Sequence, residues 1–348
     1  MIDYIDVVQC LRYGDSGKGC VSYDLARSYE FSHVMRFHGG GNAGHTIMHK
    51  GNKFVTHLIP AGVFHGKPSI VGSGCVINVN KFFEEMEKLR VFLPEHDVYS
   101  LVKIANNCHI VTEENIKQDA EDKTIGTTKS GNGPCYRDKY DRKGVRAEDV
   151  PSLHNFIIDP YRYFYDTNNK IQLLCEGAQG FYLDIDHGDY PYVTSSHCGI
   201  GSVLLNGFNP KQIRNVYGLV KAYDTYVGAK KFQPTYNDGC SVDSWERGDP
   251  KIFEDIQRVG QEIGATTGRK RQVNWLDLEE TKKAILMNGV NILVVKKYDV
   301  LVELDKFGLI TENGVVRYET FEDFKEQIEN YFSPYVEEII FSNNPAGL

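Results

Sequence analysis

The sequence predicts an α/β fold: a single large domain over residues 1–348, with a central, mostly parallel sheet flanked by helices and long active-site loops. Three observations predict it. Short β-branched runs alternate with stretches whose apolar residues recur at three- and four-residue spacing. Glycine-rich segments follow several of these runs, where the ligand-binding loops of such sheets lie. No repeat, low-complexity tract or proline-rich linker divides the chain.

The expected elements follow from these patterns. The apolar runs predict buried strands at residues 6–10, 33–37, 69–71, 173–175, 215–220 and 291–295. The helical spacing predicts helices at residues 20–29, 79–89, 250–262, 276–287 and 321–331. The acidic stretch 319–338 is expected to be a solvated amphipathic helix that leads into a strand, and we assign it no chemistry.

Composition excludes several classes of protein. The net charge is -8 and there is no basic tail, so we expect no nucleic-acid partner and a small phosphate ligand. The eight cysteines form no C-x-x-C pair, which argues against a zinc site and against a disulfide scaffold. The N-terminus lacks the layout of a signal peptide, and no apolar run approaches the ~18 residues of a membrane span. We therefore expect a cytoplasmic protein without a membrane partner.

Residues 13–19, Tyr-Gly-Asp-Ser-Gly-Lys-Gly, lie between an expected strand and an expected helix. Glycines at such a junction let backbone N–H groups close on phosphate oxygens, which Lys18 can neutralise. The glycine spacing differs from that of a P-loop, and Gly19 stands where that motif needs Ser or Thr. A plain strand-to-helix turn is the simplest alternative. Asp15 favours function, because a carboxylate in an anion-binding loop suggests a metal ligand or a base.

Three further segments carry polar side chains suited to ligands. Residues 39–46 place Asn42 and His45 among glycines, although a lone histidine is more often structural than catalytic. Residues 264–271 gather hydroxyl and guanidinium groups that suit a carboxylate or phosphate. Residues 119–146 are the best candidate for a mobile phosphate-binding flap, and a solvated loop is the alternative.

Taken together, these blocks resemble the adenylosuccinate synthetase family. The resemblance also covers the ordered segments His57-Leu58-Ile59-Pro60, Ile125-Gly126-Thr127-Thr128, Glu176-Gly177-Ala178-Gln179-Gly180, Lys221-Ala222-Tyr223 and Trp275-Leu276-Asp277. It implies a P-loop-related fold and a ligase that joins L-aspartate to C6 of a 6-oxopurine nucleotide through a 6-phosphoryl intermediate, with Mg²⁺ and a nucleoside triphosphate. It also implies a homodimer.

The resemblance further implies roles for individual residues. The catalytic residues would be Asp15, His45 and Lys18, with Asp15 as the base at purine N1, and the metal ligands would be Asp15 and the carbonyl of Gly44. The triphosphate would bind Ser16, Gly17, Lys18, Gly19, Gly44, His45, Thr46, Lys297 and Asp299. The nucleotide substrate would bind Asn42, Thr128, Gln179, Thr194, Val227, Arg269 and, from a neighbouring subunit, Arg142. L-Aspartate would bind Thr266, Thr267, Arg269 and Arg271.

The chain departs from the family pattern at several positions. Ser16 replaces the glutamate of Gly-Asp-Glu-Gly-Lys-Gly-Lys, Cys20 replaces the last lysine, and Tyr226 replaces the arginine of Thr-Arg-Val-Gly. The chain is also short for the family. These features resemble the compact bacteriophage branch, which converts dGMP to N6-succino-2-amino-2'-deoxyadenylate in the 2-aminoadenine DNA pathway and would work in the host cytoplasm. We therefore expect dGMP as the substrate, with IMP, as in an ordinary adenylosuccinate synthetase, as the alternative.

The phosphoryl donor is a separate question. Asn344 stands where the family has a glycine whose backbone approaches guanine, which favours ATP or dATP, whereas the Asp299 carboxylate suits guanine donors and leaves GTP possible. Two other classes of protein stay open. A nucleotide-dependent switch protein would have no use for residues 264–271, and an inactive metabolite-binding relative would lose Asp15 or His45.

Overall fold

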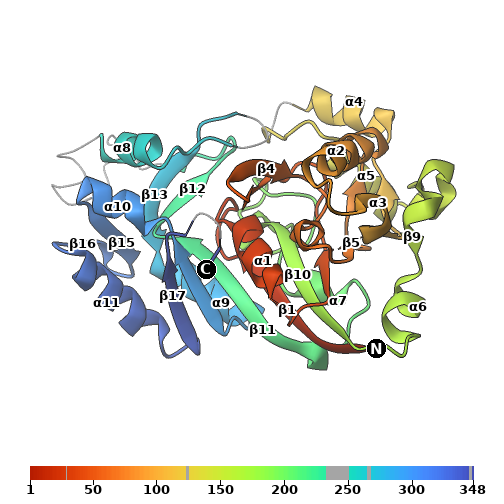
Figure 1. The fold of residues 1–348 in the computed structure, drawn as a ribbon. Helices are drawn as coiled ribbons and strands as arrows, with labels where there is room; N and C mark the ends of the chain where they lie inside the picture. The colour runs from red at the N-terminus through yellow and green to blue at the C-terminus, as the bar shows by residue number, and fades with distance from the viewer. Residues whose placement is uncertain (29, 123–124, 233–250, 265–267, 345–346) are drawn as a thin grey trace.

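The structure is a computed structural model that describes residues 1–28, 30–122, 125–232, 251–264, 268–344 and 347–348 (Figure 1). Thr266 and Thr267, two of the predicted aspartate-binding residues, lie outside the described residues. None of the described helices is long and apolar enough to cross a membrane.

A nine-stranded sheet forms the centre of the described structure, and all of its neighbouring strands pair in parallel. This confirms the predicted α/β class. In order across the sheet, the strands are β17 (Glu338–Ser342), β14 (Ile292–Lys296), β11 (Ile213–Lys221), β1 (Ile2–Cys10), β10 (Ile171–Gly180), β2 (His33–Arg36), β5 (Ser69–Val71), β7 (Val102–Ala105) and β9 (Ile157–Ile158).

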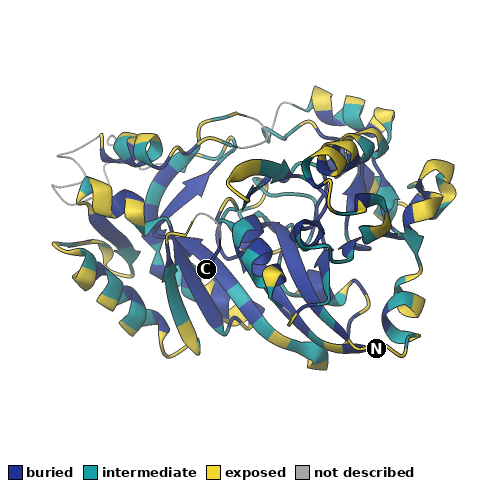
Figure 2. Cartoon of the chain, in the orientation of Figure 1, coloured by how far each residue is buried: buried dark blue, intermediate teal, exposed yellow. Residues whose placement is uncertain are grey.

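Each face of the central strands packs into a different part of the core, because successive side chains of a strand point to opposite faces. On one face, Val8 of β1 and Leu174 of β10 join a cluster with Val21 of the first helix. On the other face, Val7 and Leu173 join a larger cluster that extends to Trp275. The strands are therefore buried, and the exposed residues gather on the outer helices (Figure 2).

Helices connect the parallel strands and cover the sheet. They are α1 (Lys18–Arg27), α2 (Val79–Phe92), α3 (Val98–Leu101), α4 (Glu113–Glu121), α5 (Asn132–Tyr140), α6 (Pro160–Tyr165), α7 (Gly201–Leu204), α8 (Ile252–Val259), α9 (Leu278–Asn288), α10 (Tyr298–Leu304) and α11 (Phe321–Phe332). The longer ones show clear sequence causes. In α11 the Thr320 side chain caps the first turn, and the buried Phe324, Ile328 and Phe332 recur every four residues.

A second, four-stranded sheet lies beside the central one. It consists of β12 (Tyr223–Tyr226), β13 (Gln272–Asp277), β15 (Phe307–Thr311) and β16 (Gly314–Tyr318). Two smaller pairs complete the strands of the described residues: the hairpin of β3 (His45–His49) with β4 (Asn52–Thr56), and β6 (Val76–Ile77) with β8 (His109–Ile110). The β3–β4 hairpin carries His45 at its start, so its position decides where that histidine lies.

The structure corrects two predictions. The helix predicted at 276–287 begins only at Leu278, because Leu276 and Asp277 complete β13 and the Asp277 side chain caps the helix. The predicted flap at 119–146 is not a bare loop, since it contains α5. Gly131 supplies the left-handed turn before α5, and the buried Asp119 carboxylate accepts a 2.7 Å hydrogen bond from the Gly131 N–H.

Candidate active site

One pocket of about 520 Å³ gathers most of the predicted site residues. It lies beyond the carboxyl ends of β17, β14, β1 and β10, together with the loop that follows β2 and residues at and just after the end of Tyr223–Tyr226. This is where a parallel sheet binds ligands. Predicted residues that line it are Asp15, Ser16, Gly17, Lys18, Gly19, Asn42, Gly44, His45, Thr46, Thr128, Gln179, Val227, Arg269, Arg271, Lys297 and Asp299.

The loop between β1 and α1 forms the floor of this pocket. Gly14 and Gly17 have φ of 93° and 86°, so both need the left-handed backbone that glycine adopts freely. Lys18 is almost fully buried at the first position of α1. Gly19 lies so close to the hairpin that a Cβ there would come within 2.6 Å of the His45 Cβ. The loop therefore places Lys18 and the helix N-terminus at the pocket, as an anion site requires.

His45 is held by two buried residues to which the sequence analysis gave no role. Its Nδ1 lies 2.5 Å from Glu176 Oε1, and the same carboxylate oxygen accepts a 2.8 Å bond from Arg36. The second Glu176 oxygen accepts from the Ala61 N–H at 2.9 Å. Burial would raise the pKa of Glu176, but Arg36 and His45 outweigh it and lower that pKa. Glu176 is therefore an ionised carboxylate that fixes the orientation of the imidazole.

The same surroundings favour the neutral form of the histidine. Burial, with the nearby cation Arg36, lowers the pKa of His45 to about 4 despite the Glu176 carboxylate. The other ring nitrogen, Nε2, lies 3.4 Å from the Ala178 carbonyl oxygen, so both ring nitrogens face acceptors. An N–H on both nitrogens would satisfy this arrangement. Negative charge brought into the pocket by a ligand would favour that protonated form.

Asp15 is held by a second buried network. Arg271 Nε donates to Asp15 Oδ2 at 2.8 Å, and Arg271 Nη1 donates to Glu262 Oε2 at 2.5 Å. Glu262 is fully buried and also accepts from Lys221 Nζ at 2.8 Å and from the Tyr223 hydroxyl at 2.7 Å. The sequence analysis gave Glu262 no role, although it is only two residues from the 264–271 block.

The predicted nucleotide-binding residues divide into two groups. Asn42 and Gln179 face each other across the pocket, where Gln179 Nε2 donates to Asn42 Oδ1 at 3.0 Å, and Thr128 lies on the same lining. Arg269 Nη1 donates to the Gly126 carbonyl at 2.9 Å. Thr194 and the exposed Arg142 are absent from the lining of the pocket in the described structure, although the Thr194 N–H donates to the carbonyl of the lining residue Leu183 at 2.8 Å.

At the end of the pocket predicted to bind the triphosphate, the ends of two neighbouring strands meet. Lys296 of β14 is buried and donates to Ser342 Oγ of β17 at 3.1 Å. The next residue, Lys297, donates to the Gly260 carbonyl at 3.1 Å, and Asn343 Oδ1 lies 3.4 Å from the Asp299 N–H. Lys297 and Asp299 are predicted triphosphate-binding residues, whereas Lys296 was not among the predicted site residues.

Two groups of residues offer donor atoms of the kind that metal ions bind. Asp15 and the Gly44 carbonyl line the same pocket and offer hard oxygen donors, which fit Mg²⁺. Asp184, Asp186 and His197 also cluster, with ligand atoms within 4.8 Å of one another. The Asp184 carboxylate, however, already accepts from the backbone N–H groups of Asp186, His187 and Cys198. It therefore braces its own loop.

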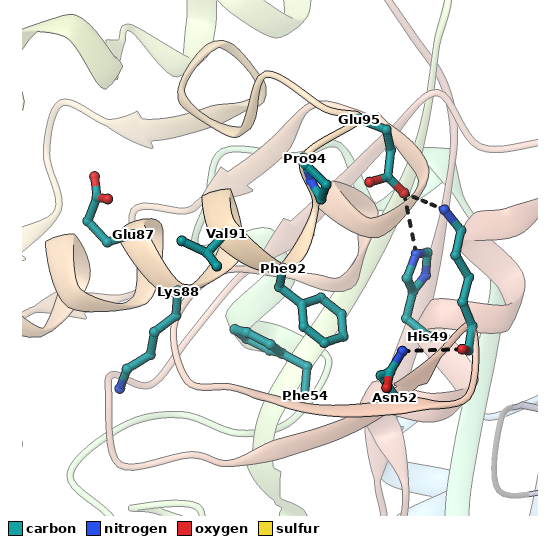
Figure 3. Close-up of a pocket in the computed structure, with 10 residues that line it drawn as sticks. His49, Asn52, Phe54, Glu87, Lys88, Val91, Phe92, Pro94 and Glu95 are labelled. Atoms are coloured by element: carbon teal, nitrogen blue, oxygen red, sulfur yellow. Dashed lines mark hydrogen bonds and ion pairs between the residues drawn. The ribbon is translucent and has the colours of Figure 1, made fainter.

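A larger groove of about 900 Å³ shares no lining residue with this pocket (Figure 3). It lies between the β3–β4 hairpin and the C-terminal half of α2. Its Phe54 and Phe92 rings pack against each other at a centroid distance of 4.9 Å, and its Glu95 pairs with Lys50. None of the predicted site residues lines it, and we assign it no chemistry.

Comparison with known proteins identifies one family. The family model for adenylosuccinate synthetase matches residues 7–171 and 150–339. The adenylosuccinate synthetase of Desulfosudis oleivorans is 35% identical, over 93% of this chain and 83% of its own length. That of Helicobacter pylori strain HPAG1 is 34% identical, over 94% of this chain and 87% of its own length.

Two solved structures share the fold. Fully ligated adenylosuccinate synthetase from Plasmodium falciparum aligns with a TM-score of 0.82 at 26% identity, covering 99% of this chain and 98% of that one. Cyanophage S-2L succinoaminodeoxyadenylate synthetase, PurZ, bound to dGMP and to dATP as an energy donor, aligns with a TM-score of 0.73. The alignment covers 99% of this chain and 94% of that one at 20% identity. At this identity the likeness supports a shared fold and nothing more.

Proposed function

Because this chain belongs to the adenylosuccinate synthetase family, we propose that its pocket joins L-aspartate to C6 of a 6-oxopurine nucleotide with the help of a nucleoside triphosphate. The observation that carries the proposal is the meeting, in one pocket, of the phosphate loop, His45 and Arg271. A nucleotide, a triphosphate and a carboxylate each find a group suited to them there. The enzyme is a ligase that forms a C–N bond.

Asp15 is the proposed base. It takes the proton from purine N1, so that O6 becomes nucleophilic and attacks the γ-phosphorus, and the nucleoside diphosphate leaves. Adenylosuccinate synthetases use Mg²⁺, which neutralises charge on the triphosphate when bound, and Asp15 and the Gly44 carbonyl would hold it. The amine of aspartate then attacks C6 and phosphate leaves. In the structure Arg271 binds one Asp15 oxygen, Oδ2, and in this proposal that contact breaks when Asp15 turns to purine N1.

His45 is the proposed stabiliser of the phosphoryl group in transfer. Because Nδ1 is bound to the ionised Glu176, only Nε2 is free to turn toward a phosphoryl oxygen, and it must carry a proton to donate. The triphosphate charge, together with Glu176, would supply the field that raises the pKa of His45 from its ligand-free value. Lys18, at the N-terminus of α1, would bind the phosphates.

We propose IMP as the nucleotide substrate, since the relatives at 34–35% identity are adenylosuccinate synthetases. The prediction of dGMP is the second candidate, and one observation favours it. Ser16 lines the pocket directly after Asp15, and its buried hydroxyl has no hydrogen-bond partner among the described residues. A 2-amino group on the purine could supply that partner. A glutamate at this position would occupy the space that the 2-amino group needs. The cyanophage structure with dGMP shows that this fold can hold that nucleotide.

The proposed phosphoryl donor is GTP, which adenylosuccinate synthetases use, and ATP or dATP is the alternative. Asp299 lines the triphosphate end of the pocket and suits the N1 and N2 donors of guanine. Asn344, which stands where the family has a glycine, lies on the same lining and leaves less room for a guanine. This residue is the argument for ATP or dATP. Competition binding of GTP against ATP separates the two donors.

The proposed active unit is a homodimer. Arg142 is exposed, has a left-handed φ of 61° and does not line its own pocket, so we propose that it reaches the nucleotide phosphate in the partner subunit. Mixing two inactive variants, Asp15→Asn and Arg142→Ala, would test this. A mixed dimer has one pocket with both native residues, and activity should return. Failure to regain activity in dimers shown to exchange subunits would refute the role in trans.

Phosphate release tests the main proposal. Purified protein with Mg²⁺, aspartate and each triphosphate is compared on IMP and dGMP, and the product mass is measured. Aspartate-dependent release with IMP alone would support the first candidate, and release with dGMP alone would support the second and make Ser16→Glu the first reversal to try. Release that does not require aspartate would contradict the ligase itself.

A further inference from the structure

Arg271 binds two carboxylates that differ in burial. Asp15 is about one-third exposed and lines the pocket, whereas the Glu262 side chain is fully buried behind the pocket. The link to Glu262 is also doubled, because the Arg271 N–H donates to the Glu262 carbonyl at 3.0 Å in addition to the side-chain ion pair. Glu262 is thus a fixed partner of Arg271, and Asp15 is an exchangeable one.

The atoms used by each carboxylate matter for recognition. Glu262 takes only Nη1, and Asp15 takes only Nε. A carboxylate bound in two-pronged fashion on the side of a guanidinium uses Nε and Nη2 together. Once Asp15 turns to the nucleotide, that Nε–Nη2 edge faces the pocket, while Glu262 still holds the opposite nitrogen.

The charges around Glu262 explain why it can serve as an anchor. It accepts hydrogen bonds from Arg271, Lys221 and Tyr223, and Lys221 in turn donates to Thr225 Oγ1 at 2.8 Å. Burial would raise the pKa of Glu262, but Lys221 and Arg271 outweigh it and lower that pKa to about 2. The carboxylate therefore stays ionised, and its three donors fix it from separate strands and loops.

We propose that Glu262 is a positioning residue that aims the Nε–Nη2 edge of Arg271 at the carboxylate of the incoming L-aspartate. This inference rests on the proposed function. The Glu262 side chain accepts hydrogen bonds from Arg271, Lys221 and Tyr223, none of which is a proposed nucleotide- or triphosphate-binding residue, so its effect on KM should fall on aspartate. Arg271 without Glu262 would keep its charge but lose the fixed direction of its guanidinium.

Steady-state kinetics of Glu262→Gln test the proposal. Losing a charge-assisted hydrogen bond that orients Arg271 should raise KM for aspartate about tenfold or more, while KM for nucleotide and for triphosphate stays within about threefold. Tyr223→Phe is the matched control, because it removes another donor to Glu262 and leaves the Arg271 pair in place. Its KM for aspartate should stay within about twofold of wild type.

A double-mutant cycle with Arg271→Lys separates positioning from a general structural effect. If Glu262 acts through Arg271, Glu262→Gln adds almost nothing to KM for aspartate in the Arg271→Lys background. Fully multiplicative effects, or an unchanged KM in Glu262→Gln, would overturn the role of Glu262. Should Glu262→Gln fail to fold, Glu262→Asp keeps the charge but shortens the reach to Arg271, and the same rise in KM is expected. A wild-type enzyme without aspartate dependence would instead refute the proposed function.

Discussion

Replacing Gly19 by alanine should disable catalysis more than it destabilises the protein. An ideal Cβ at Gly19 lies 2.6 Å from the His45 Cβ, whereas ordinary contacts begin near 3.4 Å, so His45 must retreat by about 0.8 Å. His45 is almost fully buried and bound to Glu176, so it cannot retreat without leaving its acceptor. A displacement of about 1 Å in a positioned catalytic group costs about 100-fold in rate.

The stability change has two opposing parts. Overpacking costs about 1–3 kcal/mol, and alanine is better than glycine in a helix by at most about 1 kcal/mol. We therefore expect a net loss of about 0–2 kcal/mol in the free energy of unfolding. Gly41→Ala is the control, because a Cβ at Gly41 meets nothing within 4 Å and its φ is not positive.

Phosphate release and urea denaturation are the two assays for this pair. Gly19→Ala should lose about 100-fold in kcat, while Gly41→Ala stays close to wild type. If both variants keep kcat within about twofold of each other, the contact between α1 and the hairpin does not set the position of His45, and the reasoning fails.

Three further predictions follow from the same structure. Glu176→Gln should lower kcat about 100-fold with little change in KM for nucleotide, because His45 loses its ionised partner; a kcat within about threefold of wild type would contradict this. Burial lowers the folded-state pKa of His33 to about 4 from 6.5, so the unfolded chain binds that proton more readily, and the stabilisation is complete above pH 6.5 and lost as pH falls toward 4. The midpoint of urea denaturation should therefore fall less between pH 7 and pH 5 in His33→Gln than in wild type. Equal falls in the two proteins would contradict this. Removing Mg²⁺ with EDTA should abolish phosphate release and added Mg²⁺ restore it, whereas full activity in EDTA would exclude Asp15 and Gly44 as metal ligands.

The fold and the phosphate loop were predictable because their signals are local. Six apolar runs identified six strands of the central sheet, and the glycine spacing at residues 13–19 indicated the turn before α1. Short strands such as β7 and β9 gave no periodic signal. Leu276 and Asp277 continued the helical pattern of α9, but pairing with Leu309 and Ile310 of β15 keeps them in a strand. Tertiary pairing outweighed local periodicity there.

The supporting residues of the site were harder to predict because their partners are distant in sequence. Glu176 lies 131 residues from His45 and 140 from Arg36. The sequence did carry one signal for them, because Arg36 and Glu176 are charged residues within apolar strand runs. A buried charge of this kind must be paired. Arg142 and Thr194 rested on resemblance alone; the Thr194 N–H does donate to the carbonyl of Leu183, which lines the pocket, whereas Arg142 is exposed and absent from the lining.

The pocket has a consequence for synthesis of the chain on the ribosome. One wall is the loop of residues 13–19 and another is the end of β17, held by Lys296 through Ser342. A nascent chain that has not yet released β17 has residues 13–19 but lacks Ser342, Asn343 and Asn344 of the pocket lining. The lining of the pocket is therefore complete only after the last strand of the central sheet has been translated.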